Sequence, residues 1–159
     1  MNVCSTTAAA AAKASSTSPR ADIQPLVDQT ETLPARGILG PDRLLAVERG
    51  VVLETDASAA RAVARPHASF YLARNAYRDM LIRLGFDEDQ LANGGSDDLI
   101  DAVVAWGDEA AIAARVREHF AAGADHVCLQ PLALDPADAC FGTLRSLAPA
   151  LIETGASWT

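Results

Sequence analysis

Hydrophobic residues recur along the chain at two periods, and these periods predict most of its secondary structure. After Gly50, apolar side chains spaced three or four residues apart are typical of helices that bury one stripe. We expect such helices near 57–65, 68–84, 96–106, 108–122 and 138–152. Short apolar, β-branched runs near 51–54 and 126–131 predict two buried parallel strands.

Polar residues, glycines and prolines indicate where these elements begin and end. Ser96 and Asp108 are placed to cap helices, because each side chain can accept a backbone N–H. Gly123 is a good helix terminator, since glycine adopts the left-handed conformation without strain. Pro66 removes one helical hydrogen bond and clashes with the preceding turn, so we expect a break or kink there. The run at 87–90 predicts a short acidic turn or helix.

The predicted order of elements is strand, several helices, strand, helix, which indicates the α/β class. Two parallel strands joined by helices need a right-handed crossover. Typical sheets have about 4–6 strands, and both predicted strands have the composition of strands buried on two faces. The sequence therefore predicts a helix-rich fold with two recognisable parallel strands, each of which needs further neighbours.

Composition and charge exclude some classes of function. The 159 residues suffice for one domain, and half of them are apolar. The net charge of −8, with no Lys/Arg cluster, argues against binding nucleic acid or an anionic membrane surface. No apolar run approaches the roughly 18 residues of a membrane span. The three scattered cysteines do not suggest a disulfide framework, so we expect a reduced, soluble, cytoplasmic protein.

The first part of the chain has a different composition from the rest. Residues 1–20 are rich in Ala, Ser and Thr, and lack the basic start and strongly apolar centre of a secretory signal. Their serines and their lack of acids leave an organelle transit peptide as an alternative to a disordered leader. We interpret 1–36 as a disordered leader or irregular segment, 37–152 as the folded body and 153–159 as a tail.

Four segments of the folded body resemble the carboxyl-terminal part of the luciferase-like flavin and deazaflavin oxidoreductases. They are GVVLETDASAARAVARPHASFYL, NAYRDMLIRLGF, GGSDDLIDAVVAWGDEAAIAARVREHFAAGADHVCLQ and LRSLAPALI. The resemblance is greatest to the branch that depends on coenzyme F420, and it covers about 37–152. The run from Gly94 to Gln130 is its most specific part.

The resemblance implies a fold, a cofactor and an activity. The family fold is a (β/α)8 TIM barrel of about 250 residues, so 37–152 would be its last third, with 126–132 as the eighth strand. A complete relative passes a hydride between F420 and a small organic substrate; FMN, as in the monooxygenases of the family, is the less expected cofactor. The chain has no counterpart of the first barrel strands, so we expect it to be inactive alone.

A second reading belongs to another class of function. The chain would then be a non-catalytic helical module that associates with itself or with a partner chain, which could supply the remaining barrel strands. Exposed strand edges would provide the interface.

The row His126, Cys128 and Gln130 is the first candidate for site chemistry, because alternate residues of a strand share one face. A zinc site needs three or four ligands, and no further Cys or His has suitable spacing. We therefore expect no metal site, and we interpret the row as packing within a closing strand.

Other polar groups each have two readings. The resemblance places His67, Tyr71, Asn75 and Tyr77 near the substrate side of the family pocket, whereas their helical spacing also fits core contacts. Gly107-Asp108 could direct a helix N-terminus at an anion or be an ordinary cap. A third group could bind a cation or form a solvated face, since it lacks the alternation of a calcium loop. Its members are Asp87, Glu88, Asp89, Asp97 and Asp98. Catalytic and cofactor-binding residues are left unassigned.

Overall fold

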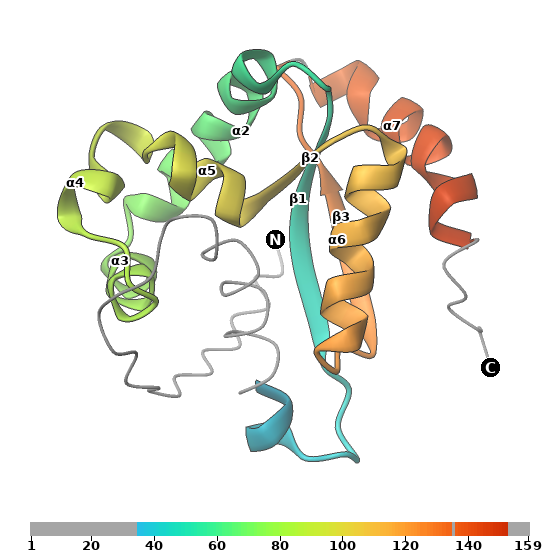
Figure 1. Cartoon of the computed structure of the whole chain (residues 1–159), viewed down its shortest axis with the longest axis horizontal. Coiled ribbons are helices and arrows are strands. Elements are labelled where there is room, and N and C mark those ends of the chain that lie inside the picture. Colours follow the sequence, from blue (N-terminus) through green and yellow to red (C-terminus); the bar gives the residue numbers. More distant parts are fainter. Residues whose placement is uncertain (1–34, 135, 153–159) are drawn as a thin grey trace.

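Three parallel strands form the centre of the protein. The computed structural model describes residues 35–134 and 136–152. Its strands are β1 (Ala46–Leu53), β2 (Val104–Gly107) and β3 (His126–Pro131), which pair in the order β2-β1-β3 (Figure 1). The predicted α/β class and the parallel pairing of the two predicted strands are confirmed. The leader up to residue 34 and the tail from residue 153 lie outside the described residues.

β2 was not predicted, and the expected helix over 96–106 is wrong in its last turn. Helix α5 (Asp97–Val103) ends where β2 begins, and Val104 and Ala105 are almost completely buried beside β1. A short apolar run is compatible with a buried helix or a buried strand, so periodicity could not separate the two. β1 is also longer than the predicted 51–54, because its first residues pair with β3.

The expected break at Pro66 is also wrong. Helix α2 (Ala57–Leu72) runs through Pro66, and the chain leaves the helix after Leu72 before α3 (Asn75–Arg83) begins. The predicted single helix over 68–84 is therefore two helices. Every fourth residue of α2 is buried on both sides of the proline, and this continuous stripe offsets the loss of one hydrogen bond. The stripe consists of Ala60, Ala64, Ala68 and Leu72.

Helices cover both faces of the sheet (Figure 1). Val52 packs with α2 and α5, whereas its neighbour Val51 packs with α6 (Glu109–Ala121) and α7 (Pro136–Ile152). This alternation follows from the period of two in a strand. The structure confirms the predicted helices near 108–122 and 138–152.

The strand order differs from that of a (β/α)8 barrel. Consecutive strands are neighbours in such a barrel, but here β1 separates β2 from β3. Right-handed crossovers that run in opposite directions across a sheet place their helices on opposite faces. The two helical layers agree with that rule, so the described part of the chain has the connectivity of an open, doubly wound sheet.

A second hydrophobic cluster forms beside the sheet. It joins the end of α2 to α3, α4 (Glu88–Leu91) and α5, and it includes Leu72, Leu81, Phe86, Leu91 and Leu99. The predicted acidic turn at 87–90 forms the start of α4. A capping box begins this helix, and in it Asp87 accepts a hydrogen bond from the Gln90 N–H at 2.8 Å. No helix in residues 35–134 and 136–152 is both long and apolar enough to cross a membrane.

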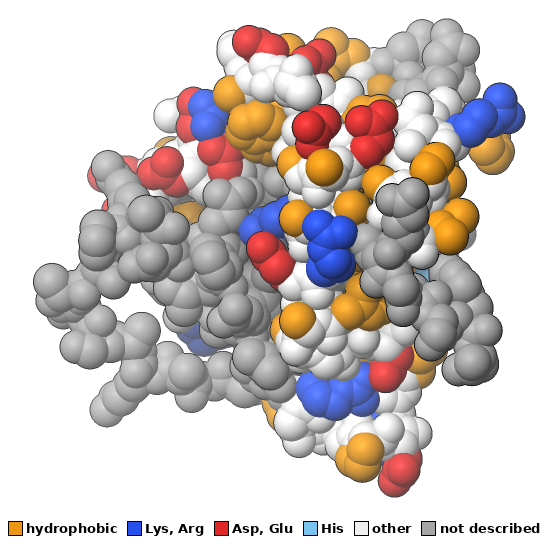
Figure 2. Space-filling model, turned by 45° about the vertical axis from the view of Figure 1, so that its right-hand side comes forward, with side chains coloured by type: hydrophobic (Ala, Val, Ile, Leu, Met, Phe, Trp, Pro, Cys, Tyr) orange, Lys and Arg blue, Asp and Glu red, His pale blue; other side chains and the backbone are white. Residues whose placement is uncertain are grey.

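Several large hydrophobic side chains are exposed at the carboxyl-terminal end of the fold. Leu134, Phe141 and Ile152 are 75%, 82% and 68% exposed, respectively. Figure 2, which brings the side of the molecule with α6 and α7 forward, shows hydrophobic side chains at several places between charged ones. Exposed apolar area of this kind is a candidate contact surface.

Candidate functional site

A pocket of about 170 Å³ lies between the sheet and the helices α2, α3 and α5. Six aliphatic or methionine side chains of these helices line it, namely Ala68, Leu72, Met80, Leu81, Leu99 and Val103. The sheet contributes Glu48, Arg49, Gly50 and Gln130, and the aromatic residues are His67, Tyr71 and Tyr77. An apolar pocket with a few convergent polar groups is the usual form of a small-molecule site.

The pairing of β1 with β3 places the polar groups of the sheet on one face. Gly50 lies opposite Gln130, and Glu48 is two residues before Gly50, so all three belong to the face that carries the pocket. A Cβ at Gly50 would lie 3.2 Å from Leu132 Cδ1 and 3.4 Å from His67 Nε2. His67 of α2 therefore lies directly against the central strand.

Three rings form a corner of the pocket. His67 and Tyr71 are four residues apart on α2, and their ring centroids lie 5.0 Å apart at an interplanar angle of 66°. Tyr77 of α3 meets Tyr71 at 4.8 Å and 64°. Such edge-to-face contacts are a favoured arrangement of aromatic side chains. They join α2 to α3 across the two non-helical residues between these helices.

Burial is the main cause of the pKa shifts of His67 and Tyr71 in this corner. It lowers the pKa of His67, against the effect of the nearby Glu48 carboxylate. Burial also raises the pKa of Tyr71, with further increases from Glu48 and Tyr77 and an opposing effect from Arg74. His67 and Tyr71 are therefore uncharged at neutral pH, and Glu48 supplies the negative charge.

Sequence reasoning found part of this site. Of the four helical candidates, His67, Tyr71 and Tyr77 line the pocket and Asn75 does not. Glu48 was missed because it precedes the apolar run that predicted the strand. The alternation that places Glu48 in the pocket becomes visible only once β1 is known to begin at Ala46.

The row His126, Cys128 and Gln130 does share one face of β3, but all three side chains are exposed. Their predicted role in packing is wrong, because α6 and α7 cover the other face of β3, which carries Leu129. Only Gln130 lines the pocket. In the two described ranges, no three His, Cys, Asp or Glu side chains are grouped so as to hold a metal ion.

Asp108 is an ordinary N-cap. Its carboxylate accepts a hydrogen bond from the Ala111 N–H at 2.8 Å, as expected for the first turn of α6. Gly107 before it has a φ of 135°, and a Cβ there would lie 2.8 Å from Ala111 Cβ. Both residues thus serve the tight turn from β2 to α6.

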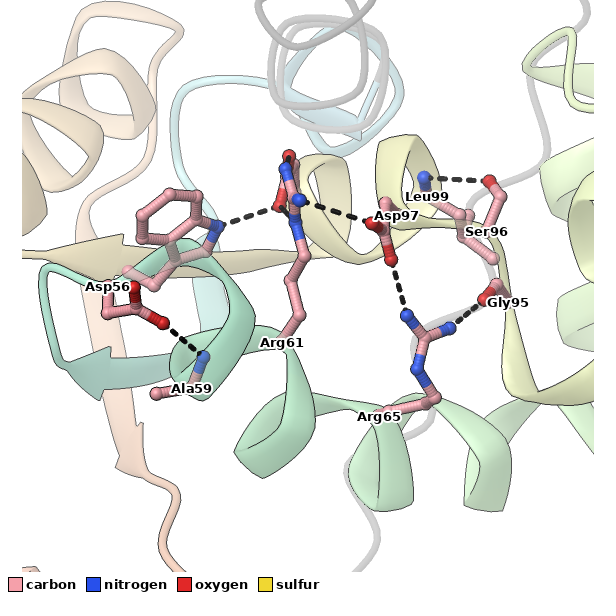
Figure 3. Close-up of polar contacts among 10 residues, drawn as sticks. Asp56, Ala59, Arg61, Arg65, Gly95, Ser96, Asp97 and Leu99 are labelled. Carbon is pink, nitrogen blue, oxygen red and sulfur yellow. Dashed lines mark hydrogen bonds and ion pairs between the residues drawn. The ribbon is translucent and has the colours of Figure 1, made fainter.

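Two of the candidate acids pair with arginines. Figure 3 shows Asp97 between Arg61 and Arg65 of α2, and Asp97 forms an ion pair with each. Asp101 accepts from Arg61 Nε at 2.8 Å and from the Trp106 indole N–H at 2.8 Å. Glu88, likewise, pairs with an arginine of α3. The contacts of Asp97 and Asp101 fix α2 and β2 against α5.

A buried polar pair lies behind the pocket, on the other face of the sheet. Arg49 of β1 and His119 of α6 are 5% and 0% exposed. Arg49 Nε and Nη2 donate to His119 Nε2 at 3.0 and 2.8 Å, because a guanidinium has no acceptor. Arg49 Nη1 donates to the Val103 carbonyl at 2.9 Å and to the Ala102 carbonyl at 3.2 Å. The pair therefore joins β1 to α6 and to the end of α5.

The same environment disfavours charge on both partners. Burial, then Arg49 and Arg115, lowers the pKa of His119 to about 3. Burial, then Arg115, lowers the pKa of Arg49 to about 9, with Glu118 opposing. His119 is thus neutral, with its proton on Nδ1, and Arg49 carries the charge. No sequence pattern indicated this pair, whose members are 70 positions apart.

Comparisons with family models, curated proteins and solved structures found no match to this chain. The function of the protein is therefore inferred from its residues and from the pocket.

Proposed function

We propose that the chain is the carboxyl-terminal part of a luciferase-like, F420-dependent oxidoreductase, and that the pocket holds its organic substrate. The supporting observation is the aromatic corner of His67, Tyr71 and Tyr77. The family resemblance expects these helices on the substrate side, and the three side chains line one pocket with Glu48 and Gln130. The role of this part of the chain is to bind and orient the substrate and to exclude water.

The described residues do not fit F420 itself. The pocket of about 170 Å³ is below the roughly 300–1,000 Å³ of pockets that hold larger ligands. Its carboxylate would also repel an anionic cofactor. F420, or FMN in the less expected case, would have to bind to barrel strands beyond those described. The chain alone should therefore be inactive, and we place the protein in the cytoplasm, where Cys128 stays reduced.

The proposal includes the finer fold, a partial (β/α)8 barrel. In a complete barrel β2 would lie between β1 and β3, because consecutive strands are neighbours. Completion of the barrel would thus have to separate β1 from β3, which pair directly in this chain. This rearrangement is a specific requirement of the proposal.

Purification followed by fluorescence titration with F420, with FMN as the control, tests the proposal. The isolated chain should bind F420 weakly or not at all. The chain co-expressed with the product of an adjacent reading frame that encodes the first barrel strands should bind F420 and reduce or oxidise a substrate. Absence of such strands from the gene neighbourhood, together with no F420 binding by any co-purified complex, would refute the proposal.

A second candidate is the non-catalytic module that associates with itself or a partner. It is favoured by β3, which lies at the edge of the described sheet with one face exposed, and by the exposed Leu134, Phe141 and Ile152. An unpaired strand edge can bind another chain. Light scattering over a range of protein concentrations should then show dimers or larger species, and a monodisperse monomer would contradict this candidate.

A further inference from the structure

We infer that the pocket takes a small organic cation, with a protonated amine beside Glu48 and the tyrosine rings and an apolar body toward α3 and α5. The inference rests on the proposed function only where it identifies this cation as the substrate of an oxidoreductase. Binding itself depends on the described residues and needs no F420.

The exposed side chain of Glu48 places a carboxylate at the wall of the pocket. Within the described part of the chain, no hydrogen bond or ion pair engages it. Its field reaches both ionisable rings, because it opposes the lowering of the His67 pKa by burial and adds to the rise in the Tyr71 pKa that burial causes. A carboxylate whose lone pairs are available attracts an ammonium group and repels an anion.

The nearest guanidinium groups are occupied elsewhere. Arg49 also lines the pocket, but its guanidinium donates to His119 and to the Val103 carbonyl. Arg74 lies over the Phe70 ring at 3.8 Å and donates to the Phe70 carbonyl at 2.6 Å. Neither is placed to neutralise Glu48 inside the pocket.

The aromatic corner adds a second attraction for a cation. The faces of aromatic rings carry negative potential and attract ammonium groups. His67 is uncharged here, so it does not compete for that position. Because Tyr71 meets His67 and Tyr77 at 66° and 64°, a cation in the corner would lie over a ring face while remaining near Glu48.

The volume limits the apolar part of the ligand. The pocket measures about 170 Å³, and a dry cavity of about 150 Å³ holds benzene. One ring with a short amine arm therefore matches this volume. Benzylamine, benzyl alcohol and benzoate share that body and differ in charge, so they form a matched set of probes.

Titration of the full chain with these probes, without F420, tests the inference by NMR chemical shifts at fixed low salt. Benzylamine should bind about tenfold more tightly than benzyl alcohol, and benzoate should not bind. Glu48→Gln should bring benzylamine to within about threefold of benzyl alcohol. Glu109→Gln, an equal change of charge at the start of α6, should leave the order unchanged, and circular dichroism checks that each variant is folded.

Equal affinities for benzylamine and benzyl alcohol, or a full preference retained in Glu48→Gln, would overturn the inference. If none of the three probes binds, the inference is also overturned, whether or not F420 binds. The opposite failure is distinguishable: a cation preference without F420 binding by any complex would refute the oxidoreductase proposal and leave the cation site standing.

Discussion

Replacing His119 by leucine should destabilise the fold far more than a surface histidine substitution would. The change removes the acceptor of two Arg49 N–H groups, at 3.0 and 2.8 Å, and leaves a buried guanidinium without that partner. Leaving a buried donor without its acceptor costs about 1–3 kcal/mol, and more when the donor is charged. A domain has only about 5–15 kcal/mol in total, so the loss should be a large fraction of the stability.

A double-mutant cycle separates the pair from simple loss of packing. Arg49→Met with His119→Leu replaces the pair by apolar side chains, and the double variant should recover at least about 2 kcal/mol relative to His119→Leu. His126→Leu is the matched control, because His126 is exposed on β3. Unfolding in urea, followed by circular dichroism, gives the free energies. A coupling energy near zero would refute the reasoning.

The same histidine gives a pH dependence with a defined sign. The folded pKa of His119, about 3, is below its ordinary value of 6.5, so the unfolded chain binds the proton more readily. Stability is therefore complete above about pH 6.5 and falls as the pH decreases toward 3, by up to about 1.4 kcal/mol per unit. His119→Leu should remove that component of the slope, and an unchanged slope would contradict the assignment.

Four other changes test the fold. Asp101→Ala removes an acceptor shared by an arginine and the Trp106 indole, and should cost about 1–3 kcal/mol in urea unfolding. Gly107→Ala should cost more than about 2 kcal/mol, because φ is 135° and the new methyl group would meet Ala111. Gly142 lies in α7 with open space around it, so Gly142→Ala should instead stabilise the fold by about 0.5–1 kcal/mol. Equal melting temperatures for Gly107→Ala and Gly142→Ala would contradict this pair of predictions. Glu48→Cys should form a disulfide with Cys128, its partner across β1 and β3, on mild oxidation, whereas a barrel-like separation of these strands would prevent it.

The sequence predicted the elements whose burial follows one simple period. The stripe of Ile112 and Val116 in α6 is an example, because a helix with one buried face repeats every three or four residues. Prediction failed where the environment overrides the local pattern. β2 is a strand because it lies beside β1, and α2 continues through Pro66 because its buried stripe is continuous.

The site was predictable to a similar extent. His67 and Tyr71 could be proposed, since aromatic residues four apart share a helix face. The place of Glu48 in the pocket could not be predicted without knowing where β1 begins. The contact of Arg49 with His119 depends on how two crossovers bring distant segments together, and no local pattern contains that information.

The neighbouring residues Glu48 and Arg49 place opposite charges on opposite faces of the central strand. A slip of β1 by one position would exchange them, bringing a guanidinium into the aromatic corner and a carboxylate against neutral His119. Most strands are protected from such slips by hydrophobic alternation alone. Here a slip would also bury a carboxylate in place of Arg49, so the buried pair adds to the selection of one alignment during folding.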